Sequence, residues 1–136
     1  PDLTHEITID GELSIPEEKP PLESILDCFV EFEFTKTEVI DTKLTIGSPP
    51  KPVTKVIVMG EAQIYIKYVG DTEEGDQPVH GAHFKVPFES LIEWPGGPLA
   101  GTPLCVCATV EHFQIDPLNQ RDLFKVLVVR LDVFQD

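Results

Sequence analysis

The chain has 136 residues, with 24 acidic and 10 basic side chains and a formal net charge of −14. This length predicts one domain of the usual ~100–200 residues, which can bury a core without metal or disulfide bonds. So acidic a surface repels nucleic-acid phosphates and anionic lipid, and no apolar run reaches the roughly 20 residues of a membrane span. We therefore expect neither nucleic-acid binding nor membrane insertion.

The first predicted element is a strand over residues 6–15, "EITIDGELSI", whose polar and apolar residues alternate. It is followed by "PEEKPP", residues 16–21, a stiff and extended linker. The sequence leaves two arrangements open: the strand folds back onto its own sheet, or it joins the sheet of a neighbouring subunit as a donor strand. In the second arrangement the contact does not close on itself and gives a filament or ring. The assembly interface would then consist of the apolar side chains Ile7, Ile9, Leu13 and Ile15.

The strand and its proline-rich linker divide the chain into an N-terminal segment, residues 1–19, and a β-sandwich domain, residues 20–136. The second part opens with "PLESILD", residues 21–27, which predicts one or two helical turns after a proline. Residues 28–34, "CFVEFEF", then alternate as a strand, and residues 37–46 form a weaker one. For residues 47–54, "GSPPKPVT", we expect a loop outside the sheet, because proline cannot donate to a strand ladder.

Residues 56–70 predict a long strand, with Gly60 as a bulge or bend in its middle. Its apolar face consists of the even positions Val56, Val58, Ala62, Ile64, Ile66 and Tyr68. A charged hairpin loop follows, and residues 79–88 form the next strand, before a short turn predicted at residues 89–94. Two further strands are predicted over residues 104–115 and 123–134. The last one begins apolar on both faces, which predicts a central position in its sheet.

These seven or so strands predict an all-β fold, a mainly antiparallel and jelly-roll-like β-sandwich with at most one or two short helical turns. The 13 prolines and nine glycines fit a β-protein with many loops. The alternation places eight apolar side chains in the core: Val58, Ile64, Ile66, Phe84, Val86, Val106, Leu127 and Val129.

Several short motifs in this order resemble the SPOCS domain of endospore-forming bacteria. They are "IDGELSIPEEKPPLESIL", "TEVIDTKL" and "KVIVMGEAQIYIKYVGDTEEGDQPVHGAHFKVPF". The matching positions are Gly11, Leu13, Pro16, Lys19, Pro20, Ile25 and Leu26, then 55–58, Gly60, Tyr68 and Val69, and then 77–80, Pro87 and Phe88. The resemblance weakens after Trp94, and the chain departs from the family at Pro21, where an acidic residue is usual, and in the longer loop at residues 47–54.

The resemblance implies a structural protein of the spore coat or extracellular spore surface, which acts through protein–protein contacts. Its expected partners are other copies of itself or other spore-surface proteins. No catalytic residue and no cofactor come with this resemblance, and we expect neither. The alternative is a β-sandwich that binds a carbohydrate or another small ligand; only Tyr65 clearly lies on a polar strand face, where it could stack on a sugar ring.

The candidate chemical motifs are weak. His80 and His83 are three apart, so on a strand they point to opposite faces and could share a metal ion only with a bulge at Gly81. Residues 71–82 carry acidic groups but fail the pattern of a calcium-binding EF-hand loop. A catalytic pair of Cys105 or Cys107 with His112 is disfavoured, because odd and even strand positions point apart.

The three cysteines, Cys28, Cys105 and Cys107, do not form a closed disulfide set. Residues two apart on a strand lie roughly 6.6 Å from each other, near the upper limit for a disulfide. We therefore disfavour a Cys105–Cys107 bond. If a disulfide forms, we expect one of these thiols to reach Cys28 or another chain.

Overall fold

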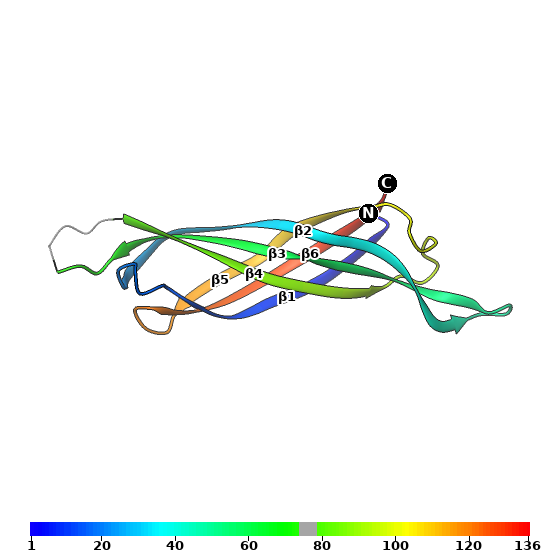
Figure 1. Ribbon diagram of the computed structural model, residues 1–136, viewed down its shortest axis with the longest axis horizontal. Helices are drawn as coiled ribbons and strands as arrows, with labels where there is room; N and C mark the ends of the chain where they lie inside the picture. The colour runs from blue at the N-terminus through cyan, green and yellow to red at the C-terminus, as the bar shows by residue number, and fades with distance from the viewer. Residues whose placement is uncertain (74–78) are drawn as a thin grey trace.

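The computed structural model describes residues 1–73 and 79–136, which form six β-strands and no helix (Figure 1). Within this described part of the chain, we find no helix of the length and apolar character needed to cross a membrane. The strands are β1 (Leu3–Ser14), β2 (Leu22–Ile46), β3 (Lys51–Gly70), β4 (Val79–Glu93), β5 (Leu104–Pro117) and β6 (Asp122–Gln135).

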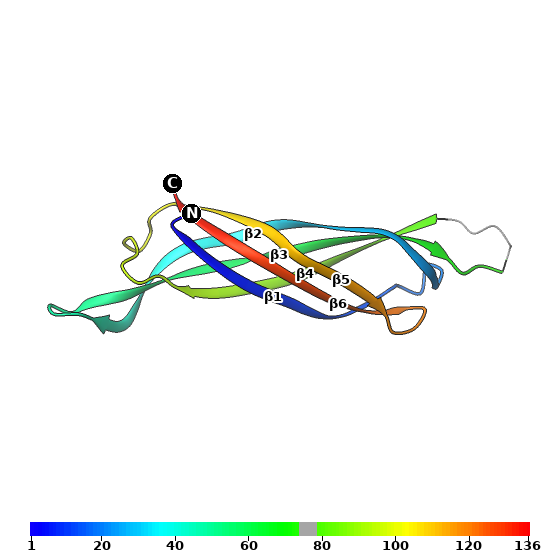
Figure 2. The same cartoon turned by 180° about the vertical axis from the view of Figure 1, so that it is seen from behind.

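The strands form two three-stranded antiparallel sheets, one with the order β1-β6-β5 and the other with the order β2-β3-β4. Figures 1 and 2 show the two sheets as layers of an elongated sandwich, with the β2–β3 hairpin extending beyond one end. The predicted β-sandwich is therefore confirmed, with six strands rather than seven. The central position predicted for the last strand is confirmed too, since β6 lies between β1 and β5.

The core between the sheets consists of two apolar clusters. One contains Val56 and Val58 of β3 with the alternate residues Leu127, Val129, Leu131 and Val133 of β6. The other contains Ile64, Ile66 and Tyr68 of β3 with Leu13 and Leu123. All even positions predicted for the apolar face of β3 are buried. Of the eight predicted core residues, five are buried, and the other three, Phe84, Val86 and Val106, are partly buried and pack against the clusters.

Three local predictions are wrong. Residues 21–27 form no helical turn, because β2 already begins at Leu22 and runs for 25 residues along β3. The expected turn at 89–94 is also strand, as β4 continues to Glu93. In the expected loop at 47–54, β3 already starts at Lys51. Pro52 pairs with Thr45 beside an irregularity in β2, and proline, which has no N–H to donate, is tolerated in a sheet at such places. Long-range pairing overrides the local signal at each place.

Gly60 lies opposite a bulge, as the sequence suggested, but the extra residue is in the partner strand. Phe34 pairs with Gly60 while Lys36 pairs with Met59, so the pairing skips one residue of β2. A Cβ at Gly60 would lie 2.3 Å from the carbonyl oxygen of Glu33. Glycine is therefore required because the backbone of β2 approaches β3 too closely for any side chain.

Candidate functional site

The predicted assembly strand lies in its own sheet within the single chain. β1 pairs with β6 along its whole length, from Leu3 opposite Val133 to Ser14 opposite Asp122. Its predicted interface side chains all face the sandwich interior: Ile7 is partly buried, and Ile9, Leu13 and Ile15 are 8%, 7% and 3% exposed. The same pairing could be made between two chains, so the exchanged arrangement stays a prediction.

The linker after β1 is fixed to the rest of the molecule by Arg121, at the β5–β6 turn. Its guanidinium donates hydrogen bonds to the main-chain oxygens of Pro16 (2.9 Å) and Lys19 (3.0 Å). The Tyr68 hydroxyl donates to the Pro20 oxygen at 2.9 Å, and the backbone N–H of Ile15 donates to Arg121. These bonds hold the linker against its own chain.

Among the described residues, four strands each have one edge that no other strand pairs with: β1 and β5 in one sheet, and β2 and β4 in the other. On the β2 edge, the Val39 oxygen accepts a hydrogen bond from the Gly101 N–H. Such edges can accept a further strand through main-chain hydrogen bonds. Their protection differs, because β2 contains no proline in its 25 residues whereas β4 contains Pro87, which has no N–H to donate.

The β2–β3 hairpin carries apolar side chains beyond the end of the sandwich. Leu44 and Ile46 are 63% and 53% exposed, and Leu99, in the segment that faces the hairpin tip, is 82% exposed. A groove of about 730 Å³ lies between the tip and residues 96–99. Exposed apolar side chains gathered around a groove are typical of protein contact surfaces.

An aromatic row crosses the outer face of the β2-β3-β4 sheet. Phe29 of β2 stacks on Tyr65 of β3 with ring centroids 4.7 Å apart, and Tyr65 stacks on His83 of β4 at 4.3 Å. The planes are within 14° and 4° of parallel, so both faces of Tyr65 are covered. The sequence pointed to Tyr65 alone. Phe29 interrupts an otherwise acidic run at odd positions, and this was the signal that could have found the row.

Polar groups flank the aromatic row on both sides. The ring nitrogen Nε2 of His83 lies 2.6 Å from Oε1 of Gln63, whose amide nitrogen donates to Glu33 at 3.2 Å. On the other side, a hollow of about 420 Å³ lies over Gly81, between the rings and the charged side chains of Lys19 and Lys67. This hollow can hold a small ligand, although only the edge of Tyr65 is left for contact.

The two histidines point to opposite faces, as their spacing predicts. His83 belongs to the outer aromatic row, whereas His80 lies beside Tyr68, with ring centroids 5.8 Å apart. Gly81 pairs regularly with Lys67, so no bulge brings the histidines together. Nε2 of His80 is buried without a hydrogen-bond partner among the described residues. The charged hairpin loop expected after β3, where the calcium-loop pattern fails, lies in part outside the described residues, since it includes 74–78.

The thiols lie on different parts of the sandwich. Cys105 and Cys107 are exposed neighbours on the outer face of β5, and the interaction with Cys107 raises the pKa of the Cys105 thiol. Cys28 packs on the inner side of β2, where burial, and then Asp27, raise its thiol pKa. All three thiols are free. Cys28 faces the core, whereas Cys105 and Cys107 face solvent. If Cys105 or Cys107 forms a disulfide, the geometry therefore favours a bond to another chain rather than to Cys28.

Cys107 and His112 lie on the same face of β5, against the expectation from their odd and even positions. A bulge between Val110 and His112 shifts the alternation of β5, so His112 is on the same face as Cys107 rather than the opposite one. Their pairing partners on β6, Val128 and Asp132, are four residues apart, or about 13 Å along a strand. The thiol and the imidazole are therefore too far apart to act as a pair.

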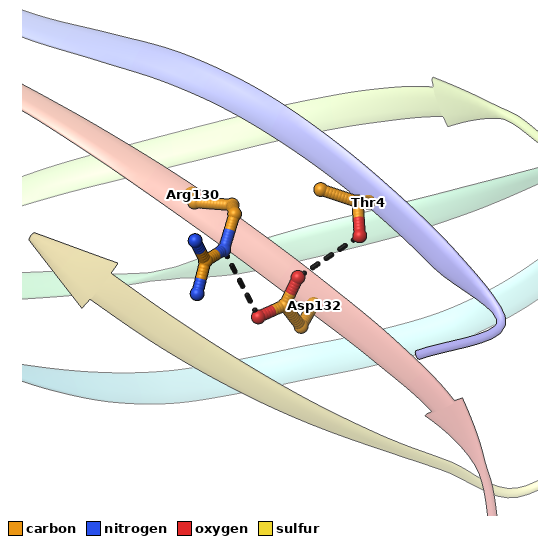
Figure 3. Close-up of polar contacts among 3 residues, drawn as sticks. All are labelled: Thr4, Arg130 and Asp132. Carbon is orange, nitrogen blue, oxygen red and sulfur yellow. Dashed lines mark hydrogen bonds and ion pairs between the residues drawn. The ribbon is translucent and has the colours of Figure 1, made fainter. Parts of the chain in front are cut away.

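The outer face of the β1-β6-β5 sheet is held by polar contacts between strands (Figure 3). Asp132 of β6 accepts a hydrogen bond from the Thr4 hydroxyl at 2.9 Å and pairs with Arg130 at 3.2 Å. The carboxyl of Glu111 on β5 has a raised pKa, first because its protonated form donates a hydrogen bond to Glu6 of β1. These contacts join all three strands across the solvent-facing side.

The comparisons with known proteins agree with the motifs. A family model described as the SPOCS domain of SipL matches residues 21–118, nearly three quarters of the chain. The match runs from the start of β2 to the end of β5, and so includes the aromatic row and the apolar hairpin. Neither the curated proteins nor the solved structures gave a match. This chain belongs to the SPOCS domain family, whose name associates it with the bacterial spore.

Proposed function

We propose that this protein is a structural component of the spore coat or outer spore surface, and that it works by docking to copies of itself or to other spore proteins. The family supports a spore-associated role. The observation that carries the proposal further is the open backbone edge on four of the six strands, since an elongated sandwich with such edges is suited to extension by other chains.

Exchange of β1 is one way in which the chains would join. A neighbour's β1 would make the same main-chain bonds to β6 and bury the same Ile9, Leu13 and Ile15. Before it could leave, the linker would have to break the two bonds from Arg121. Because the contact is head-to-tail, repetition gives a filament or ring rather than a closed dimer.

Deletion of residues 1–15 tests this exchange. We expect the truncated chain to stay folded and to lose polymers that the full chain forms, as seen by electron microscopy and sedimentation. A synthetic peptide of residues 1–15 should then bind in trans, whereas a peptide with Ile9→Asp and Leu13→Asp should not. If the truncated chain unfolds as a monomer and no peptide restores it, β1 belongs to its own core and exchange is wrong.

Binding of a carbohydrate or another small ligand is the second candidate. It is supported by the hollow of about 420 Å³ beside the aromatic row and by the 51% exposure of Phe29. A sugar could stack only on the outer faces of Phe29 and His83, because Tyr65 is covered on both sides. Titration with soluble glycans, followed by NMR, should move the signals of Lys67 and Gly81. Shifts confined to other faces, or none at all, would reject this candidate.

A further inference from the structure

The aromatic row ends at the two open edges of its sheet. Phe29 lies on the edge strand β2 and His83 on the edge strand β4, with Tyr65 between them. Each terminal ring has one face covered by Tyr65 and the other turned toward its strand's open edge. Aromatic pairs on neighbouring strands stabilise a sheet, so a ring from another strand could extend the row at either end.

Next to the aromatic row, the two edges carry different charges on this outer face. Along β2, the side chains around Phe29 on the same face are Asp27, Glu31 and Glu33, all acidic. Along β4, His83 is followed on its face by the basic Lys85. Pairing of β2 with a second β2 about Phe29 would set Asp27 against Glu31, two like charges. The charges therefore favour contact between the β2 edge of one chain and the β4 edge of the next.

The strand directions fix the register of such a contact. β2 and β4 both run antiparallel to β3, so they run parallel to each other. A second copy in the same orientation would thus bring its β2 alongside β4 in parallel. With Phe29 opposite His83, Glu31 falls opposite Lys85. The inward-facing side chains then match as well, since Ala82, Phe84 and Val86 meet Cys28, Val30 and Phe32.

The usable length of each edge is similar. β2 is regular from Asp27 to Phe34, between two irregularities in its pairing with β3. On β4, Pro87 cannot donate a backbone hydrogen bond and limits the pairing on that side. In the register set by the rings, residues 27–32 of one copy lie against residues 81–86 of the next, a ladder of ordinary strand length.

We propose that a second copy of this chain adds its β2 edge to the β4 edge, so that the aromatic row continues from His83 to Phe29 of the next copy and Lys85 pairs with Glu31. The contact rests on the proposed structural function and names its partner and surface. It is heterologous and does not close, so it extends in one direction. The net charge of −14 makes two copies repel each other. Physiological salt screens this repulsion between exposed charges that are more than about 8 Å apart.

Charge exchange tests the contact by sedimentation velocity over a range of protein concentrations at physiological ionic strength. Glu31→Lys and Lys85→Glu should each weaken association roughly tenfold, because each replaces an attractive pair by two like charges. The double variant should return association to within about twofold of the wild type. Phe29→Ala should weaken association, and Phe29→Tyr should preserve it.

Glu12→Lys, on the outer face of β1, is the matched control for net charge. Glu31→Lys and Glu12→Lys both change the net charge from −14 to −12, so general repulsion alone predicts stronger association for both. The proposal predicts weaker association for Glu31→Lys only. Circular dichroism confirms that each variant is folded.

Three results would overturn the proposal: a wild-type chain that stays monomeric at its highest soluble concentration, equal behaviour of Glu31→Lys and Glu12→Lys, or no rescue in the double variant. If association is unchanged in Glu31→Lys and Lys85→Glu but is lost on deletion of residues 1–15, the edge contact is rejected and β1 exchange is supported. A chain that neither self-associates nor binds other spore proteins would reject the broader proposed function.

Discussion

At the residue scale, two interior positions hold residues that are unusual in the core of a β-sandwich, a glycine and a lysine. Gly60 has no room for a side chain, because the β2 backbone passes directly over it. Lys125, at 3% exposure, points into the sandwich between Leu123 and Leu127 of β6, with its ammonium group near Gly11. Each position leads to a stability prediction.

Gly60→Ala should lower the free energy of unfolding by roughly 2–3 kcal/mol, because the added Cβ lies 2.3 Å from backbone rather than from a movable side chain. Urea denaturation measures this change. Gly81→Ala in β4 of the same sheet is the control, since the nearest atom to its Cβ would be the Ile66 oxygen at 4.0 Å. Equal costs at the two positions would show that close backbone approach is not what requires Gly60.

Lys125→Met should raise the free energy of unfolding by about 1 kcal/mol near neutral pH, because it removes a buried charge and keeps an unbranched apolar stem. Burial lowers the pKa of Lys125, and the nearby Asp10 only partly opposes this. The unfolded chain therefore binds more protons than the folded one as pH rises toward the ordinary value of 10.5.

The wild-type protein should thus gain stability with rising pH in that window relative to Lys125→Met, as measured by urea denaturation at several pH values. Lys43→Met, an exposed position of β2, is the control and should leave the pH dependence unchanged. A destabilised Lys125→Met variant would mean that the ammonium group makes a favourable contact that outweighs its burial.

At the scale of elements, the attachment of β1 depends on the short linker rather than on the strand alone. Arg121 binds two carbonyl oxygens of the linker, and Leu22 donates its N–H to the oxygen of Gln120. The linker therefore crosses from one sheet to the other while hydrogen-bonded to the β5–β6 turn. This turn decides how readily β1 could leave its own chain.

Arg121→Ala should lower the free energy of unfolding by about 1–3 kcal/mol, since two charge-assisted hydrogen bonds to backbone are lost. The linker should also exchange its amide protons faster, which hydrogen-exchange mass spectrometry would detect in residues 16–21. Arg130→Ala is the control, because Arg130 pairs with Asp132 of its own strand and, among the described residues, has no hydrogen bond or ion pair to the linker. Unchanged linker exchange in Arg121→Ala would show that other contacts hold the linker.

At the scale of the whole molecule, the two proposed contacts use different sheets. Exchange of β1 involves the β1-β6-β5 sheet, and edge addition involves the β2-β3-β4 sheet. The termini lie close together, toward the end of the sandwich from which the β2–β3 hairpin extends (Figures 1 and 2). One chain could therefore take part in both contacts at once, and the variants above separate their contributions.

The sequence by itself determined the all-β class, the buried face of β3 and the central position of β6. These follow from alternation with a period of two and from continuous apolar runs, which depend on neighbouring residues only. The SPOCS motifs likewise identified the family without any coordinates. Lys125 shows the limit of this reasoning, because a charged residue at an inward position contradicts the pattern that surrounds it.

Only the tertiary structure decided which side chains meet. The row of Phe29, Tyr65 and His83 depends on the pairing of three strands, and His112 changed face because of one extra residue in β5. Residues 21–27 became strand because 25 residues of β2 pair along β3, against the local preference for a turn. Register and bulges are set by contacts between distant segments, so the sequence indicates where strands form but not where they begin, end or bulge.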